Sequence, residues 1–186
     1  PDYYALEVMN TILGGLFQSR LNHDIREDKG YSYGVNSNFA YGRGPGAFKA
    51  GGGIVTAKSD SALILFMKHL KGTQGEVQFT DDEIRQGKDA LVQSLPQSFS
   101  SVNGVRGSIS GIYLRDLPEK YYQEYAAKVN AVSKDDLVRV SKKYLDLDKM
   151  NLVIVGDRAV IEEALRKTGI APIVRLDVDG RPVITP

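Results

Sequence analysis

Arg26 and Tyr33 are two residues of this sequence whose types and spacing could act together on a substrate. They lie on either side of Gly30 within the stretch NHDIREDKGYSYGV, residues 22–35. A guanidinium and a phenol are both hydrogen-bond donors, and donors aimed at a developing oxyanion lower the barrier to acyl transfer. The residue types alone favour a plainer interpretation, in which Arg26 interacts with the helix dipole and Tyr33 packs on a half-buried strand.

Histidines are too few to build a catalytic zinc site within this chain. Such a site needs about three protein ligands, whereas the sequence offers only His23 and His69, which fall in different predicted helices. His23 and Glu27 stand four residues apart, where a helix places both on one face. We interpret them as a solvated surface pair, because a third ligand is missing. The sequence therefore predicts no metal site in this chain.

Glycine and serine patterns give no independent catalytic centre. The run at residues 42–46 lacks the Gly-Lys-Ser/Thr ending of a phosphate-binding loop, so it predicts a hairpin turn. Three glycines at residues 51–53 fit close approach by an extended ligand and fit a bulge with tight helix packing equally well. Ser19, Ser32 and Ser98 lie in no recognisable nucleophile motif. A hydrolase triad is unsupported.

Hydrophobic spacing and capping signals predict an α+β fold, with an antiparallel-rich sheet whose helices pack on one face. Two alternating segments at residues 31–41 and 47–56, joined by the glycine-rich turn, predict a hairpin. A later apolar segment, MNLVIVG at residues 150–156, predicts another strand, and residues 172–183 predict a short strand followed by an Asp-Gly turn. Helices are expected at residues 3–15, 17–29, 59–72, 80–96, 101–114, 118–130, 133–145 and 157–167.

Length, charge and composition limit the possible functions. The 186 residues suit a single domain spanning residues 1–186, and the opening Pro-Asp-Tyr-Tyr leads us to expect a piece of a longer protein. A net charge of +1 gives no electrostatic reason to expect nucleic acid. No apolar run reaches the roughly 18 residues of a bilayer span. The absence of cysteine excludes disulfides and thiolate chemistry and is compatible with either periplasm or cytoplasm.

The segment LGGLFQSRLNHDIREDKGYSYGV, residues 13–35, closely resembles a stretch in the second half of insulinase-like, or pitrilysin-type, zinc metallopeptidases. The shared features are a Leu-Gly-Gly turn, Ser-Arg-Leu, an Arg, a Gly and a Tyr seven places after the Arg. DYYALEVMN, TDDEI and NLVIVGD are also similar to that family, so the resemblance covers nearly the whole chain.

This resemblance implies a domain that works with a homologous zinc-bearing partner, either in the same chain or as a separate subunit. The partner half of that family binds zinc through H-x-x-E-H, which occurs nowhere here, so zinc is expected in the partner and no activity is expected from this chain alone. Arg26 and Tyr33 match the family positions that contact the substrate carbonyl. Tyr31 is a second phenol beside them, and we include it with Arg26 and Tyr33 as substrate-binding.

We therefore expect the non-zinc half of a bacterial metalloendopeptidase that holds a peptide against its sheet. A catalytically inactive scaffold of the same superfamily is the alternative. The ending LDVDGRPV resembles the tails of cell-envelope members, which leads us to expect a periplasmic location, with a cytoplasmic one as the alternative.

Overall fold

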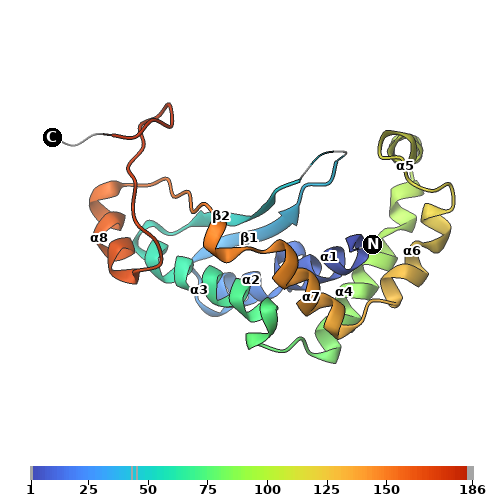
Figure 1. The fold of residues 1–186 in the computed structure, drawn as a ribbon, viewed down its shortest axis with the longest axis horizontal. Coiled ribbons are helices and arrows are strands. Elements are labelled where there is room, and N and C mark those ends of the chain that lie inside the picture. Colours follow the sequence, from blue (N-terminus) through green and yellow to red (C-terminus); the bar gives the residue numbers. More distant parts are fainter. Residues whose placement is uncertain (1, 43, 45, 184–186) are drawn as a thin grey trace.

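The structure, a computed structural model that describes residues 2–42, 44 and 46–183, has the predicted α+β fold. β1 (Ser32–Phe39) and β2 (Phe48–Ile54) pair antiparallel and form the only sheet within the described residues. The hairpin lies along one side of a helical layer, with α5 and α8 near opposite ends of the molecule (Figure 1). The α-helices are α1 (Tyr3–Asn10), α2 (Arg20–Asn22), α3 (Ser59–Lys71), α4 (Asp81–Ser94), α5 (Val102–Leu114), α6 (Tyr121–Asn130), α7 (Lys134–Tyr144) and α8 (Arg158–Thr168).

Tighter or wider helical turns extend several of these helices. The π-helical turns are η1 (Thr11–Gly15), η2 (His23–Asp28) and η4 (Gly72–Glu76), and the 3-10 turns are η3 (Thr56–Lys58), η5 (Pro96–Phe99) and η6 (Leu147–Lys149). Together α1 and η1 fill the first predicted helix. No helix in the described part of the chain is long and apolar enough to cross a membrane.

Two of the predicted helices begin with capping boxes. At α4, the Glu83 backbone N–H donates to the Thr80 hydroxyl at 3.1 Å, while the Thr80 N–H donates to the Glu83 carboxylate at 2.8 Å. Ser133 and Asp136 make the same reciprocal pair at α7, at 3.2 and 3.0 Å. Each box satisfies backbone donors that the first helical turn leaves free.

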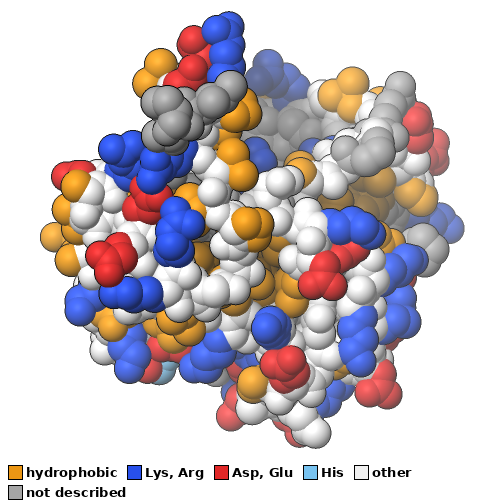
Figure 2. Space-filling model, turned by 60° about the vertical axis from the view of Figure 1, so that its left-hand side comes forward, with side chains coloured by type: hydrophobic (Ala, Val, Ile, Leu, Met, Phe, Trp, Pro, Cys, Tyr) orange, Lys and Arg blue, Asp and Glu red, His pale blue; other side chains and the backbone are white. Residues whose placement is uncertain are grey.

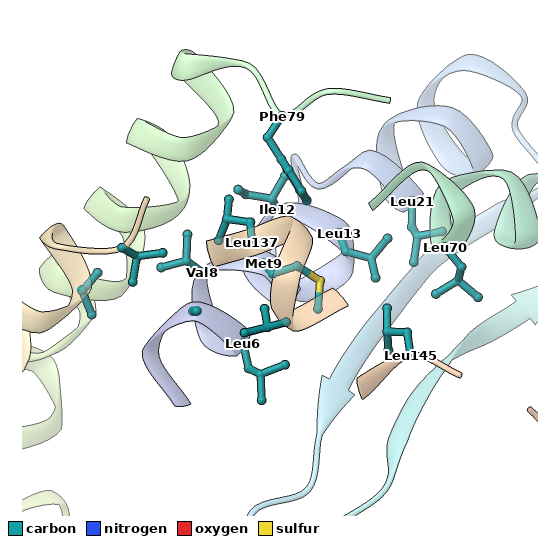
Figure 3. Close-up of a cluster of buried hydrophobic side chains, with 14 of the residues drawn as sticks. Leu6, Val8, Met9, Ile12, Leu13, Leu21, Leu70, Phe79, Leu137 and Leu145 are labelled. Carbon is teal, nitrogen blue, oxygen red and sulfur yellow. The ribbon is translucent and has the colours of Figure 1, made fainter. Parts of the chain in front are cut away.

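The hydrophobic core lies between the helices and the inner face of the hairpin. α1 and η1 run through its centre, and their side chains meet residues from α2, α3 and α7 (Figure 3). Val35 and Ser37 of β1 are buried against this layer, whereas Asn36 and Asn38 are exposed. The hairpin therefore has one covered face and one open face, as expected for helices packed on one side. The drawn core includes Leu6, Val8, Met9, Ile12, Leu13, Leu21, Leu70, Phe79, Leu137 and Leu145.

Two expected boundaries differ from the structure near the second helix and the hairpin loop. Helical structure begins at Arg20 and not at Phe17, because Leu16 and Ser19 are extended and Phe17 is exposed. The glycine-rich connection does link β1 to β2 as expected, although Arg43 and Pro45 within it lie outside the described residues.

The strand expected at residues 150–156 is absent. Met150 and Asp157 at its ends have extended backbone, but no strand partner for this segment occurs within the described residues. The expected short strand of the tail is likewise reduced to a single bridge between Leu176 and Pro182 around the Asp-Gly turn. Apolar alternation identified a segment suited to a strand, but a strand also needs a neighbour to pair with.

The position of Asp2 before Tyr3 suggests a helix cap, but Asp2 does not cap α1. Its side chain joins α1 to α7 instead. Its backbone is helical and its side chain makes no capping hydrogen bond. The carboxylate instead accepts hydrogen bonds from Arg139 at 2.8 Å, Lys143 at 2.7 Å and Tyr144 at 2.9 Å. The hydrogen bond from Lys143 is the largest of the effects that hold the Asp2 pKa well below its ordinary value.

We expect Asp2→Asn to flatten the loss of stability at acid pH. Because the Asp2 pKa is lower in the folded than in the unfolded chain, ionised Asp2 stabilises the fold above about pH 4. This contribution is lost as the pH falls below about 4 toward the folded-state pKa. Melting temperatures measured from pH 7 down to pH 2 test this. Parallel curves for wild type and variant would contradict it.

Candidate functional site

The candidate site is the junction where η2 ends and β1 begins. Gly30 has a left-handed backbone, with φ of +63°, which side chains other than glycine rarely adopt. This reversal lets the Tyr31 N–H donate to the carbonyl oxygen of Ile25 at 2.8 Å. Arg26 therefore lies in the last helical turn, and Tyr33 follows within the first residues of the strand.

Asn22 fixes the helix against the strand. Its side-chain oxygen accepts a hydrogen bond from the Val35 N–H at 2.9 Å, and its amide group donates to the Leu16 carbonyl at 3.1 Å. Asn22 is buried, so both hydrogen bonds are shielded from water, where leaving them unmade costs about 1–3 kcal/mol. The relative placement of the Arg26 and Tyr33 backbones thus depends on this side chain.

A β-bulge determines the direction of Tyr33. Ser32 pairs with Ile54 and Val35 with Gly52, so β1 contains one more residue than β2 between these pairs. In a regular strand Tyr33 would share the buried face of Val35, which lies two residues further along. The bulge interrupts this alternation, and Tyr33 is fully exposed. Bulges commonly re-aim a side chain in this way.

Ser32 stabilises the bulge through its hydroxyl. The hydroxyl donates to the Gly53 carbonyl across the hairpin at 2.7 Å and accepts from the Gly34 N–H at 3.0 Å. Ser32, which was considered above as a possible nucleophile, therefore has a structural role.

Tyr31 and Tyr33 have different surroundings. Tyr31 is half-buried against the core, and the Lys58 ammonium lies 5.6 Å from its ring centre. The geometry thus places Tyr33, and not Tyr31, on the open surface next to the junction.

The Arg26 guanidinium is stacked and ion-paired. It lies 4.1 Å from the centre of the Phe17 ring and forms a salt bridge with Glu27. Its side chain is 29% exposed. No hydrogen bond joins Arg26 to Tyr33 in the described part of the chain, so the tyrosine hydroxyl and the remaining guanidinium N–H groups are available to a ligand.

The three glycines of β2 divide between the two roles that the sequence left open. A Cβ on Gly52 would lie 2.5 Å from the Gly34 carbonyl oxygen, so Gly52 is needed for close packing within the hairpin. At Gly51 and Gly53 a Cβ would meet nothing within 4 Å. These two positions leave open space on the hairpin, and Gly53 is the β2 residue opposite the bulge that contains Tyr33.

The histidines do not form a metal centre. His23 is exposed and lies 3.5 Å from Asp28, while Glu27 pairs with Arg26. No group of three or more His, Cys, Asp or Glu side chains among residues 2–42, 44 and 46–183 could hold a metal.

A polar hollow on the helical layer was missed by sequence reasoning. It has a volume of about 710 Å³ and lies between α2, η2, α3 and α4. Asp24 lies 2.9 Å from His69 and 3.0 Å from Lys68, and burial lowers the pKa of His69 despite this carboxylate. These contacts tie η2 to α3. No sequence motif could identify them, because the partners are far apart along the chain.

Residues 1–91 match the family model described as the peptidase M16 inactive domain. A Bacillus subtilis (strain 168) protein named "uncharacterized zinc protease YmxG" is 33% identical over 100 residues, which cover 54% of this chain and 24% of the relative.

Solved structures agree with the family match. The peptidase M16 inactive domain from Pseudomonas fluorescens has a TM-score of 0.72 at 27% identity, covering 80% of this chain and 35% of that one. A protease from Helicobacter pylori shares the fold, with a TM-score of 0.60 at 20% identity, covering 78% of this chain and 35% of that one. The chain spans only about a quarter to a third of the length of these relatives. The predicted resemblance is confirmed.

Proposed function

Since residues 1–91 match the peptidase M16 inactive domain, we propose that this chain serves as the substrate-binding half of an insulinase-like zinc peptidase. In this proposal the chain has no activity of its own, and a homologous partner domain would carry the zinc. The observation that carries the proposal is the bulge that directs Tyr33 onto the open sheet face, one short turn after Arg26.

Arg26 and Tyr33 would act as hydrogen-bond donors to the substrate carbonyl oxygen. Negative charge grows on this oxygen as the peptide carbonyl becomes tetrahedral, and donors already in position then bind it more strongly than they bind the substrate. Stacking on Phe17 restricts the guanidinium of Arg26, which reduces the entropy lost when it binds the oxygen. The closing partner domain would exclude water and strengthen both hydrogen bonds.

The outer face of the hairpin would bind an extended peptide. Gly51 and Gly53 leave the sheet surface without side chains beside Tyr33, and the exposed amides of Asn36 and Asn38 lie along the neighbouring strand. A peptide lying there could approach the sheet closely and make polar contacts at its edges.

We expect Gly53→Val in the full-length protein to raise KM for a peptide about tenfold, because an isopropyl group would occupy the open space. Valine suits a strand, so the hairpin should be retained. Steady-state kinetics provide the measurement, and Ala57→Val, at an exposed position on η3, is the matched control. An unchanged KM would contradict peptide binding on this face of the hairpin.

A scaffold without catalysis is the second candidate. It is favoured by the salt bridge between Arg26 and Glu27, because this pairing occupies the Arg26 guanidinium within the protein. Hydrolysis of a quenched fluorescent peptide by the full-length protein, measured with and without a zinc chelator, separates the two. Chelator-sensitive hydrolysis supports the peptidase. No hydrolysis by zinc-loaded protein across a diverse peptide library supports the scaffold.

A further inference from the structure

The segment between α7 and α8 exposes an unusual run of aliphatic side chains. Val153 and Val155 are almost fully exposed, whereas Leu152 and Ile154 are partly covered. Their exposed fractions are 37% for Leu152, 80% for Val153, 42% for Ile154 and 95% for Val155. This alternation has the period of two residues that a strand with one covered face shows.

The backbone of this segment has no partner in the part of the chain that the structure describes. Residues 151–156 make no backbone hydrogen bond to any described residue, although Met150 and Asp157 on either side are extended. Backbone N–H and C=O groups next to apolar side chains are normally paired. The segment thus has the shape and side-chain pattern of a strand but lacks the neighbour that would pair with it.

Other aliphatic side chains are exposed outside this segment as well. Viewed with the α8 end forward, the molecule shows hydrophobic side chains at its surface between lysines and arginines (Figure 2). Val174, Leu176 and Val178 of the tail are also exposed. Soluble proteins seldom leave contiguous aliphatic surface uncovered, because burying it is worth about 25 cal/mol per Å².

We propose that residues 151–156 pair with a β-strand supplied by a part of the same protein that lies outside residues 1–186. Such a strand would satisfy the free backbone groups and cover Val153 and Val155.

Two arguments favour a strand from the same protein over a substrate or a second copy. A substrate leaves after each turnover and would expose the valines repeatedly, whereas a covalently linked strand stays in place. The relatives that this chain matches are also three to four times as long as the part it spans, so chain for such a strand exists in proteins of this kind. This inference does not depend on the proposed function.

Hydrogen–deuterium exchange on the full-length protein tests the pairing directly. Amides of residues 151–156 are expected to exchange at least about tenfold more slowly than unstructured amides, without added peptide and independently of protein concentration. Exchange at the unstructured rate overturns the proposal. Protection that appears only with added peptide, or only in a concentration-dependent dimer seen by sedimentation, also overturns it.

A pair of variants tests the covering of the side chains. Val153→Lys in the full-length protein is expected to lower the melting temperature by several degrees and to accelerate exchange of the 151–156 amides. Val178→Lys, at a fully exposed tail position, makes the same change as a control and is expected to do neither. Equal behaviour of the two variants would contradict the covering.

Discussion

Arg26→Ala in the full-length protein is expected to lower kcat for peptide hydrolysis by about 10- to 1,000-fold, and Tyr33→Phe by at least about tenfold. Each removes a donor worth about 2 to 4 kcal/mol in the transition state if its geometry is held. Donors that bind the transition state more tightly than the substrate change kcat more than KM. Steady-state kinetics on a fluorescent peptide measure both constants.

Controls separate catalysis from folding. Tyr113→Phe removes a hydroxyl from another exposed tyrosine, on α5, and Arg106→Ala removes an exposed guanidinium from the same helix. Both are expected to leave kcat unchanged. Arg26→Ala also loses the Phe17 stacking, so its melting temperature must be measured beside its kinetics. Arg26→Lys keeps the charge but not the planar fork. Wild-type kcat in both Arg26→Ala and Tyr33→Phe would reject the assigned roles.

The parts of the fold that follow local rules could be predicted from the sequence. The hairpin follows from alternation around a glycine-rich turn, and α4 and α7 begin at Thr80 and Ser133 because each has an acidic partner three residues later. These interactions involve neighbours along the chain. Local chemistry therefore decides them before the rest of the chain folds.

Features that depend on distant partners could not be predicted. Asp2 stands at the position of a helix cap, but its carboxylate accepts hydrogen bonds from Arg139 and Lys143 of α7 instead. Residues 150–156 have the sequence of a strand, but pairing requires another strand. A pattern can identify what a segment is suited to form, whereas its partners decide what it does form.

The candidate site shows the same division. The sequence identified Arg26 and Tyr33 and their resemblance to known positions, but it could not decide between Tyr31 and Tyr33 as the open phenol. That choice depends on one extra residue in β1, which the Ser32 hydroxyl stabilises by bonding to Gly53 across the hairpin. A bulge of this kind re-aims the side chains beside it, and a local irregularity in pairing cannot be read from the sequence pattern.

Gly14 carries the second large expectation, a loss of stability in Gly14→Ala. A Cβ at this position would lie 2.5 Å from the Ser37 hydroxyl oxygen and 2.7 Å from the Ser37 backbone nitrogen. The hydroxyl is held by Asn10 at 2.8 Å, and the nitrogen belongs to the paired strand β1. Neither can move without shifting η1 away from the sheet.

Overpacking of this kind costs about 1–3 kcal/mol, so Gly14→Ala is expected to lower the free energy of unfolding of the full-length protein by that amount. Gly107→Ala is the matched control, because a Cβ there meets nothing within 4 Å and the residue lies inside α5. The control should be neutral or stabilising by up to about 1 kcal/mol, since alanine favours helices. Chemical denaturation measures both changes. A loss of stability in Gly14→Ala without a loss in Gly107→Ala supports a sheet that lies directly against η1. The strand that carries Tyr33 would then have a fixed position. A Gly14→Ala protein as stable as wild type would contradict this packing.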